Sequence, residues 1–151
     1  MLSESISAGA RSESPVWGGA LRADPDWEPV FSPLVPDALA LGVETVYEAY
    51  LVHYGRPRLF DLVGDDGGVL LGDYLYAHGL VRIAEAGGVP AVAVMADLIA
   101  RCASLRADRA DPSGQLGDGA AWVDAVHALG GTPDDEAVTR ALAVHSARVA
   151  P

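Results

Sequence analysis

The stretch Val69-Leu70-Leu71-Gly72-Asp73-Tyr74-Leu75-Tyr76-Ala77-His78-Gly79-Leu80-Val81-Arg82-Ile83-Ala84 decides which fold the sequence predicts. It is typical of a helix of about four turns that is apolar over most of its circumference. At about 100° per residue, one wide apolar arc collects Val69, Leu70, Tyr76, Ala77, Leu80, Ile83 and Ala84. The other side carries Tyr74, His78, Arg82 and Glu85.

Asp73 falls in the middle of this apolar arc. An ionised carboxylate among apolar side chains is costly unless it is paired or hydrogen-bonded. We therefore expect Asp73 to be substantially buried, either bonded to a neighbouring helix or loop, or lining a polar cavity. The bonded alternative is favoured, because buried charged groups are normally paired.

The length and charge of the chain narrow its class. At 151 residues, the sequence is most simply one domain with a sizeable core. Its net charge of −11 argues against nucleic-acid binding and against adsorption to anionic membranes, since both need a basic surface. The single cysteine, Cys102, excludes an intramolecular disulfide and is expected in the core.

Hydropathy along the chain bears on its location. We find no uncharged apolar stretch of about 18 residues, so the sequence predicts no membrane insertion. The first twelve residues lack the apolar core of a signal peptide. The cytoplasm is therefore the expected location.

Residues 1–36 form a distinct arm, dense in serine, glycine and proline. Its five prolines forbid a long helix, and its first dozen residues are expected to be disordered. The arm also carries Trp17 and Trp27, which a solvated tail would not need. These aromatic side chains either pack the arm on the chain's own surface or anchor it on a partner.

Residues 37–151 are expected to form a helical domain. The pattern over 37–54 is helical, with Gly55 ending the helix. Within it, Glu44 and Glu48 stack on one side. Such a pair could hold magnesium, which takes oxygen ligands, although a solvated acidic face is the commoner meaning of this spacing. His53 is expected to be a hydrogen-bonded core histidine.

The rest of the chain repeats the helical pattern. Asp65-Asp66 resembles a catalytic acidic pair but is better explained as a glycine-flanked loop that caps the helix over 69–84. Further helices are expected over 89–106, over about 120–129, and from Thr132-Pro133-Asp134-Asp135 onwards. The predicted fold class is all-α, a bundle of about five helices with short glycine-rich connections.

Two of these segments together resemble the trans-prenyl diphosphate synthase family. The run Tyr54-Gly55-Arg56-Pro57-Arg58, a ten-residue spacer and the stretch starting at Val69 are similar to an arginine-arginine-glycine-arginine-proline turn followed by the helix valine-leucine-leucine-glycine-aspartate-tyrosine. A fainter similarity at Leu129-Gly130-Gly131-Thr132-Pro133-Asp134-Asp135-Glu136 matches the region before the family's second aspartate motif. The resemblance implies a truncated isoprenoid-synthase-like bundle, with structural roles for Gly72 and Asp73.

The chain departs from the family where the chemistry takes place. The family's first aspartate motif is replaced by a stretch that keeps only Glu44 and Glu48, and these are at most vestigial metal ligands. Its diphosphate-gripping arginines are replaced by His53 and Tyr54, and its second motif would lie beyond Arg148. The family ionises an allylic diphosphate with magnesium ions held by both motifs. We therefore expect no catalytic residue and no cofactor in this chain alone, with magnesium belonging to the assembled synthase.

Two functional hypotheses follow. The first is a non-catalytic accessory subunit of a two-component trans-prenyl diphosphate synthase, which supports a catalytic subunit and influences product chain length. Trp17, Trp27, Tyr74 and Tyr76 would then lie at or near the contact, and a homodimer would form when the partner is absent. The alternative is a stand-alone helical protein that binds a small hydrophobic or prenyl ligand. A third, weaker possibility is a residual metal-dependent enzyme that uses Glu44, Glu48 and Asp73.

Overall fold

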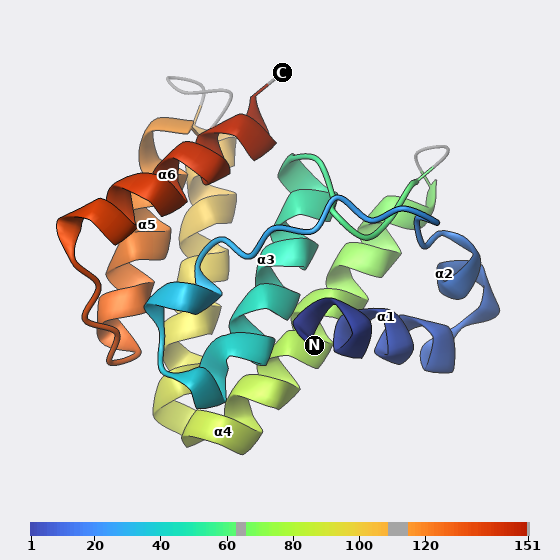
Figure 1. Ribbon diagram of the computed structural model, residues 1–151, viewed down its shortest axis with the longest axis horizontal. Coiled ribbons are helices and arrows are strands. Elements are labelled where there is room, and N and C mark those ends of the chain that lie inside the picture. The colour runs from blue at the N-terminus through green and yellow to red at the C-terminus, as the bar shows by residue number, and fades with distance from the viewer. Residues whose placement is uncertain (63–65, 109–114, 151) are drawn as a thin grey trace.

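A computed structural model describes residues 1–62, 66–108 and 115–150 of the chain (Figure 1). The described residues are all-helical and form no strand, which confirms the predicted fold class. The helices are α1 (Leu2–Glu13), α2 (Pro15–Gly19), α3 (Ala40–Tyr54), α4 (Asp66–Ala107), α5 (Gln115–Ala128) and α6 (Asp135–Val149), with 3-10 turns at Ser32–Leu34 and Asp37–Leu39. Asp65 and the side chain of Asp66 lie outside the described residues, so the acidic pair stays a prediction.

Helix α3 runs through the middle of the molecule (Figure 1). Helix α4 lies beside it, α5 and α6 pack on one side, and α1 lies on the other. Ten consecutive residues of α3, 42–51, are buried, so every face of this helix meets another part of the chain. The stretch 69–84, from which the fold was predicted, is therefore not the central helix, because it is buried on only part of its surface.

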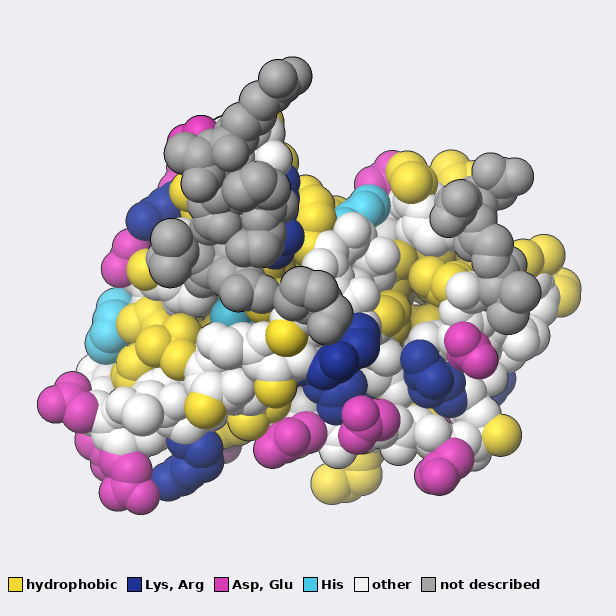
Figure 2. Space-filling model, turned by 90° about the horizontal axis from the view of Figure 1, so that it is seen from above, with side chains coloured by type: hydrophobic (Ala, Val, Ile, Leu, Met, Phe, Trp, Pro, Cys, Tyr) yellow, Lys and Arg dark blue, Asp and Glu magenta, His cyan; other side chains and the backbone are white. Residues whose placement is uncertain are grey.

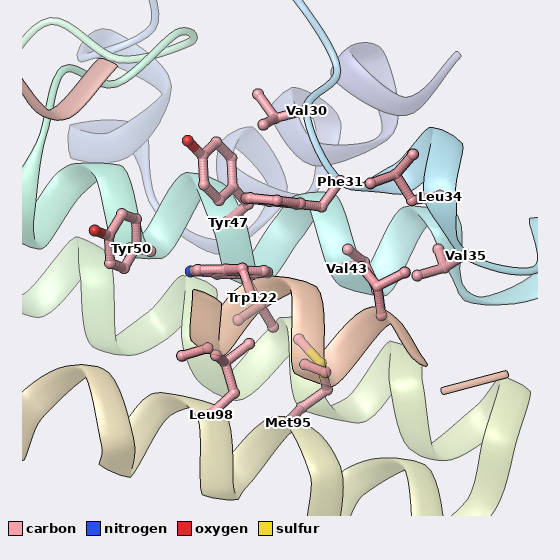
Figure 3. Packing of buried hydrophobic residues seen from close by; sticks show 14 of the residues in the cluster. Val30, Phe31, Leu34, Val35, Val43, Tyr47, Tyr50, Met95, Leu98 and Trp122 are labelled. Carbon is pink, nitrogen blue, oxygen red and sulfur yellow. The ribbon is translucent and has the colours of Figure 1, made fainter. Parts of the chain in front are cut away.

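An aromatic stack fills the core between α3, α5 and the segment before α3 (Figure 3). Phe31 and Trp122 lie parallel with ring centroids 5.0 Å apart, and Tyr47 meets both rings edge-on. All three side chains are buried. Such pairs contribute about 0.5–1.5 kcal/mol beyond the burial of their area, so they fix the segment before α3 onto the helices.

Glycines set how α4 packs on α3. A Cβ added at Gly79 would lie 2.6 Å from Val46 Cγ2, and one added at Gly42 would lie 2.7 Å from Ile83 Cδ1. Gly72 likewise faces the His53 ring so closely that no Cβ fits. The two backbones can approach only along this side of α4, so the glycine side is buried.

The predicted apolar arc of α4 is consequently divided: Ile83 is buried against α3, whereas Val69 and Leu70 are exposed. Asp73, at the centre of that arc, is 66% exposed, and its carboxylate lies 3.4 Å from His53 Nε2. The prediction that Asp73 is substantially buried is therefore wrong within this chain. A helical wheel weights apolar side chains, whereas close packing here selects glycine.

The helix over 89–106 continues α4 across a kink. Gly88 has φ 68°, which is accessible to glycine and strained for other residues, and Pro90 lies in the turn that follows. By length and composition alone, residues 67–107 of α4 could cross a membrane, since the mean hydropathy of an 18-residue window is 1.6. Within the fold, 22% of that window is buried. The sequence expectation differs from this finding because it required a stretch with no charge at all.

The N-terminal arm is more ordered than the sequence predicts. Its first dozen residues form α1 instead of a disordered tail, and Ile6 and Ala10 are buried against α3 and α4. At the other end, Asp134 caps α6 by accepting a hydrogen bond from the Ala137 amide at 2.8 Å. The helix therefore begins at Asp135, later than the start at Thr132 that the sequence predicts.

We expect Gly79→Ala to destabilise the protein. The added methyl group would overlap Val46, and overpacking of this kind costs about 1–3 kcal/mol, more than the helix propensity gained. Gly67→Ala in the same helix is the matched control, because a Cβ there meets nothing within 4 Å. Urea unfolding measures both variants. Equal midpoints for Gly79→Ala and Gly67→Ala would contradict the close α3–α4 contact.

Candidate functional site

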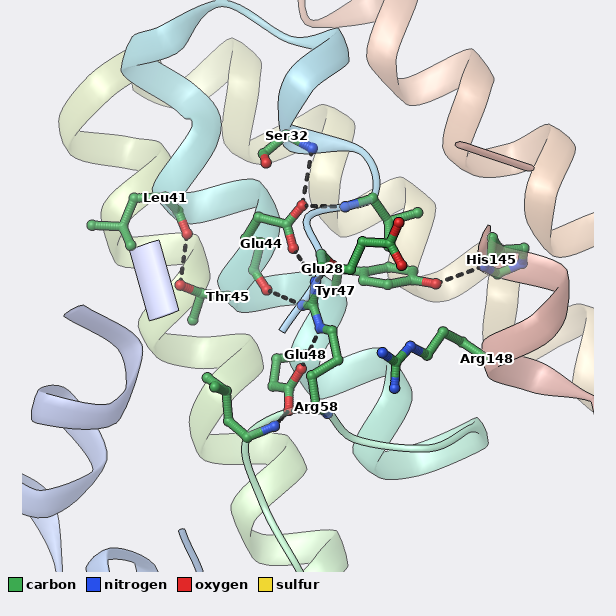
Figure 4. A network of polar contacts seen from close by, with 12 residues as sticks. Glu28, Ser32, Leu41, Glu44, Thr45, Tyr47, Glu48, Arg58, His145 and Arg148 are labelled. Carbon is green, nitrogen blue, oxygen red and sulfur yellow. Dashed lines mark hydrogen bonds and ion pairs between the residues drawn. The ribbon is translucent and has the colours of Figure 1, made fainter. Parts of the chain in front are cut away.

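Glu44 and Glu48, the acidic pair on α3, are fully buried with Arg58 (Figure 4). Glu44 Oε1 accepts hydrogen bonds from the amides of Val30 and Ser32, at 2.9 and 3.1 Å. Its Oε2 accepts from Arg58 Nη1 at 2.6 Å. One carboxylate thereby ties the segment before α3 to the turn after it.

Glu48 completes what we call the Arg58 cluster, namely Glu44, Glu48 and Arg58. Its Oε1 accepts from the amides of Arg58 and Leu59 at 2.9 and 2.8 Å, and its Oε2 accepts from Arg58 Nε at 2.9 Å. The guanidinium lies between aromatic rings, 4.2 Å from the centroid of Trp27 and 5.1 Å from that of Tyr47. Burial lowers the pKa of Arg58, but Glu44 and Glu48 outweigh burial and raise it overall.

The Arg58 cluster corrects the expectation of a solvated acidic face. All four carboxylate oxygens of Glu44 and Glu48 accept hydrogen bonds from protein donors. A magnesium ion at this pair would have to displace Arg58 and break bonds to backbone amides. The two carboxylates therefore have a structural role. Removing one partner of such a buried ion pair destabilises the folded state strongly, because it leaves a buried charge unpaired.

Arg58→Met should strongly destabilise the protein. It leaves two buried carboxylates without a cation, at a cost of about 3–5 kcal/mol. Arg140→Met is the control, because Arg140 forms an exposed ion pair with Glu136 on α6. Chemical unfolding compares the two variants, and similar midpoints would show that the Arg58 cluster is not a structural ion pair.

A second polar group, not identified from the sequence, joins α3 to α5 and α6. His145 Nδ1 lies 2.9 Å from the Tyr47 hydroxyl, as Figure 4 shows. Nearby, the Tyr50 hydroxyl donates to Asp118, which also pairs with Arg106 at 2.7 Å. Burial is the main cause that lowers the pKa of His145 to about 4. The residue types were visible in the sequence, but their spacing gave no reason to join them.

Acid should destabilise the protein through His145. Its pKa of about 4 in the folded chain lies below the ordinary 6.5, so the unfolded chain binds the proton more tightly. The stabilisation is complete above pH 6.5 and is lost as the pH falls towards 4, to a total of about 3 kcal/mol. Unfolding free energies measured across this range should fall less steeply in His145→Gln. Parallel pH profiles for the two proteins would contradict this assignment.

The third feature is the exposed apolar arc of α4, defined here as Val69, Leu70, Asp73, Ala77, Val81 and Ala84. Its large apolar side chains are 53–65% exposed. Val89, just after the kink, is 81% exposed. Apolar side chains gathered on one helix face are typical of interaction sites.

The four aromatic residues expected at a partner contact pack within the chain. Trp17 lies against Tyr74 with ring centroids 4.5 Å apart, and Tyr76 stacks on His53 at 5.1 Å. Trp27 lies over Arg58. Each is half-buried, so the alternative in which the arm packs on the chain's own surface describes these contacts.

The face of the molecule in Figure 2 carries no extended basic surface, because arginine side chains there lie beside acidic ones.

Comparison of the chain with protein-family models, curated proteins and solved structures finds no match. Among the described residues, the α4 arc is the candidate site for function, because all carboxylate oxygens of the Arg58 cluster are bonded within the chain. Around the second polar group, Asp118 Oδ1, Trp122 Nε1 and His145 Nε2 are buried without a hydrogen-bond partner in the part of the chain that the structure describes.

Proposed function

We propose that this chain is a non-catalytic accessory subunit of a two-component trans-prenyl diphosphate synthase. The observation that carries the proposal is the apolar arc of α4, which lies on the same stretch whose sequence resembles that family. On this proposal the chain is a truncated isoprenoid-synthase-like bundle that supports a catalytic subunit and influences the chain length of its product.

The Arg58 cluster supports the non-catalytic part of the proposal. A synthase would need Glu44 and Glu48 free to bind the magnesium ions that hold the diphosphate, yet Arg58 and four backbone amides already occupy their oxygens. Arg58 thus neutralises the acidic pair from inside the chain. Magnesium would belong to the catalytic subunit's own aspartate motifs.

The α4 arc supports the part of the proposal that concerns a partner subunit. Two apolar residues at its N-terminal end, Val69 and Leu70, and one in its second half, Val81, leave an apolar strip with one carboxylate in the middle. Asp73 in that strip would select for a partner that offers a donor there, since an unpaired buried charge is costly. A full-length synthase with a matching helix face is the occupant we propose.

The proposal predicts that the chain binds a catalytic synthase through α4. Val81→Arg should abolish co-purification from the native host, because it places a charge in the apolar strip. Val16→Arg is the matched control, since Val16 is 74% exposed on α2, away from the arc. Co-expression followed by size-exclusion chromatography measures the complex.

Two outcomes would contradict the proposal. One is a chain that stays monomeric when the host's synthase is added; the other is loss of the complex in both variants. Turnover of allylic and homoallylic diphosphates by the pure chain with magnesium would refute its non-catalytic role, provided that Glu44→Gln/Glu48→Gln abolishes the turnover.

One observation favours the alternative function, in which the chain is a stand-alone protein that binds a small hydrophobic or prenyl ligand. A hollow of about 260 Å³ lies between α6 and the segment before α3. Its lining is mostly apolar, including Val30, Leu34 and Val144, with the charged residues Glu28 and Arg140 also contributing. Its volume is slightly below the range of about 300–1,000 Å³ that is usual for small-molecule sites. A prenyl alcohol that protects the pure chain against thermal unfolding, with no effect on a Val144→Trp variant, would favour this alternative.

A further inference from the structure

Helix α1 is held on the bundle by a small set of contacts. Ile6 and Ala10 lie in an apolar cluster with Ala49 of α3 and with Leu71 and Leu75 of α4. Figure 1 shows α1 lying across these two helices near the edge of the molecule. Removing α1 would expose the side chains that it covers and leave the aromatic core of Figure 3 in place.

A polar ladder on α4 supplies the remaining contacts. It consists of Tyr74, His78 and Arg82, one helical turn apart. The Tyr74 hydroxyl donates to the Gly9 carbonyl at 3.1 Å, and Arg82 Nη2 donates to the Ser5 carbonyl at 3.2 Å. A Cβ at Gly9 would lie 3.3 Å from Arg82 Nη2 and 3.6 Å from His78 Nε2, so glycine lets α1 lie flat on the ladder.

Alone, α1 would be a poor helix. It has 12 residues, four of them serine and one glycine, and its N-cap makes no side-chain hydrogen bond. Isolated helices of this length are marginal in water even with good helix formers. The helical state of α1 therefore depends on its contacts with α3 and α4.

We propose that α1 is a strap that lifts from α3 and α4 as a unit while the rest of the bundle stays folded, and that acid promotes this opening through His78. Lifting uncovers Leu71 and Leu75 on α4, the helix that also carries the exposed apolar arc. The strap thereby controls how much apolar surface α4 presents. This opening belongs to the chain alone and does not depend on the proposed function.

The charges around His78 give the direction of the acid effect. Arg82, Glu85 and Tyr74 face it from α4, and Glu13 faces it from α1. Burial first, and Arg82 second, lower the pKa of His78 below its ordinary 6.5, and Glu13 and Glu85 offset only part of this. Lifting α1 removes the burial that α1 provides, while Arg82 and Glu85 stay beside His78 on α4. Because burial is the largest cause of the lowered pKa, a proton binds more tightly in the open state, which gains as the pH falls.

Hydrogen exchange on the full chain, followed by mass spectrometry, tests the strap. After correction for intrinsic exchange rates, amides of α1 should exchange more than about tenfold faster than those of α3, because local opening precedes global unfolding. Ile6→Ala should raise exchange in α1 and leave α5 and α6 unchanged. Equal protection of α1 and α3, lost together in denaturant, would overturn the strap.

A second experiment tests whether acid opens α1 through His78. Lowering the pH from about 7.5 to about 5.5 should increase opening of α1 several-fold in the native chain. His78→Gln should remove this increase, whereas His127→Gln, at an exposed position on α5, should keep it. An increase that survives in His78→Gln would show that another group drives the opening and would overturn the role of His78.

Discussion

Two carboxylates buried on the central helix need a cation, and the structure depends on how Arg58 meets that need. Glu44 and Glu48 lie on the same side of α3, where every neighbouring residue is also buried. Without Arg58 they would carry two charges into the core, which no packing of apolar side chains could offset. With Arg58 present, the two carboxylates link separate segments of the chain, because their other oxygens accept hydrogen bonds from backbone amides before and after α3.

These links explain why a segment rich in proline has a fixed course. Val30 and Ser32 donate to Glu44, which places Phe31 between them against Trp122 and Tyr47. On the other side, Arg58 donates to the Glu28 carbonyl, and Trp27 covers the guanidinium. Polar and aromatic contacts therefore act on the same short segment and hold it over α3.

The sequence predicted the class of fold and most helix positions, because glycine and acidic caps mark helix ends. Gly55 ends α3 as expected, and Gly88 marks the kink in α4 just before the helix predicted over 89–106. It could not show which side of α4 is buried. That choice depends on Gly42 and Gly79 meeting across two helices, a contact that a single-helix pattern does not contain.

Two other features could not be predicted from the sequence, for the same reason. The partner of Glu44 and Glu48 lies in the turn after α3, and no periodicity connects Arg58 to either carboxylate. Helix α1 has a composition that favours disorder, and only its contacts with α3 and α4 make it helical. In both cases tertiary contacts outweigh the local pattern, which is where reasoning from sequence alone is weakest.

Arg58 neutralises Glu44 and Glu48 inside the folded chain, and together with backbone amides it bonds all four of their carboxylate oxygens. Nuclear magnetic resonance of arginine side chains labelled with ¹⁵N tests this arrangement most directly. The Nε–H signal of Arg58, assigned through its couplings to the backbone of the native chain, should be protected from exchange with water and should not move when magnesium is added. An Arg58 signal that exchanges as fast as that of exposed Arg140, or that shifts with magnesium, would contradict the account.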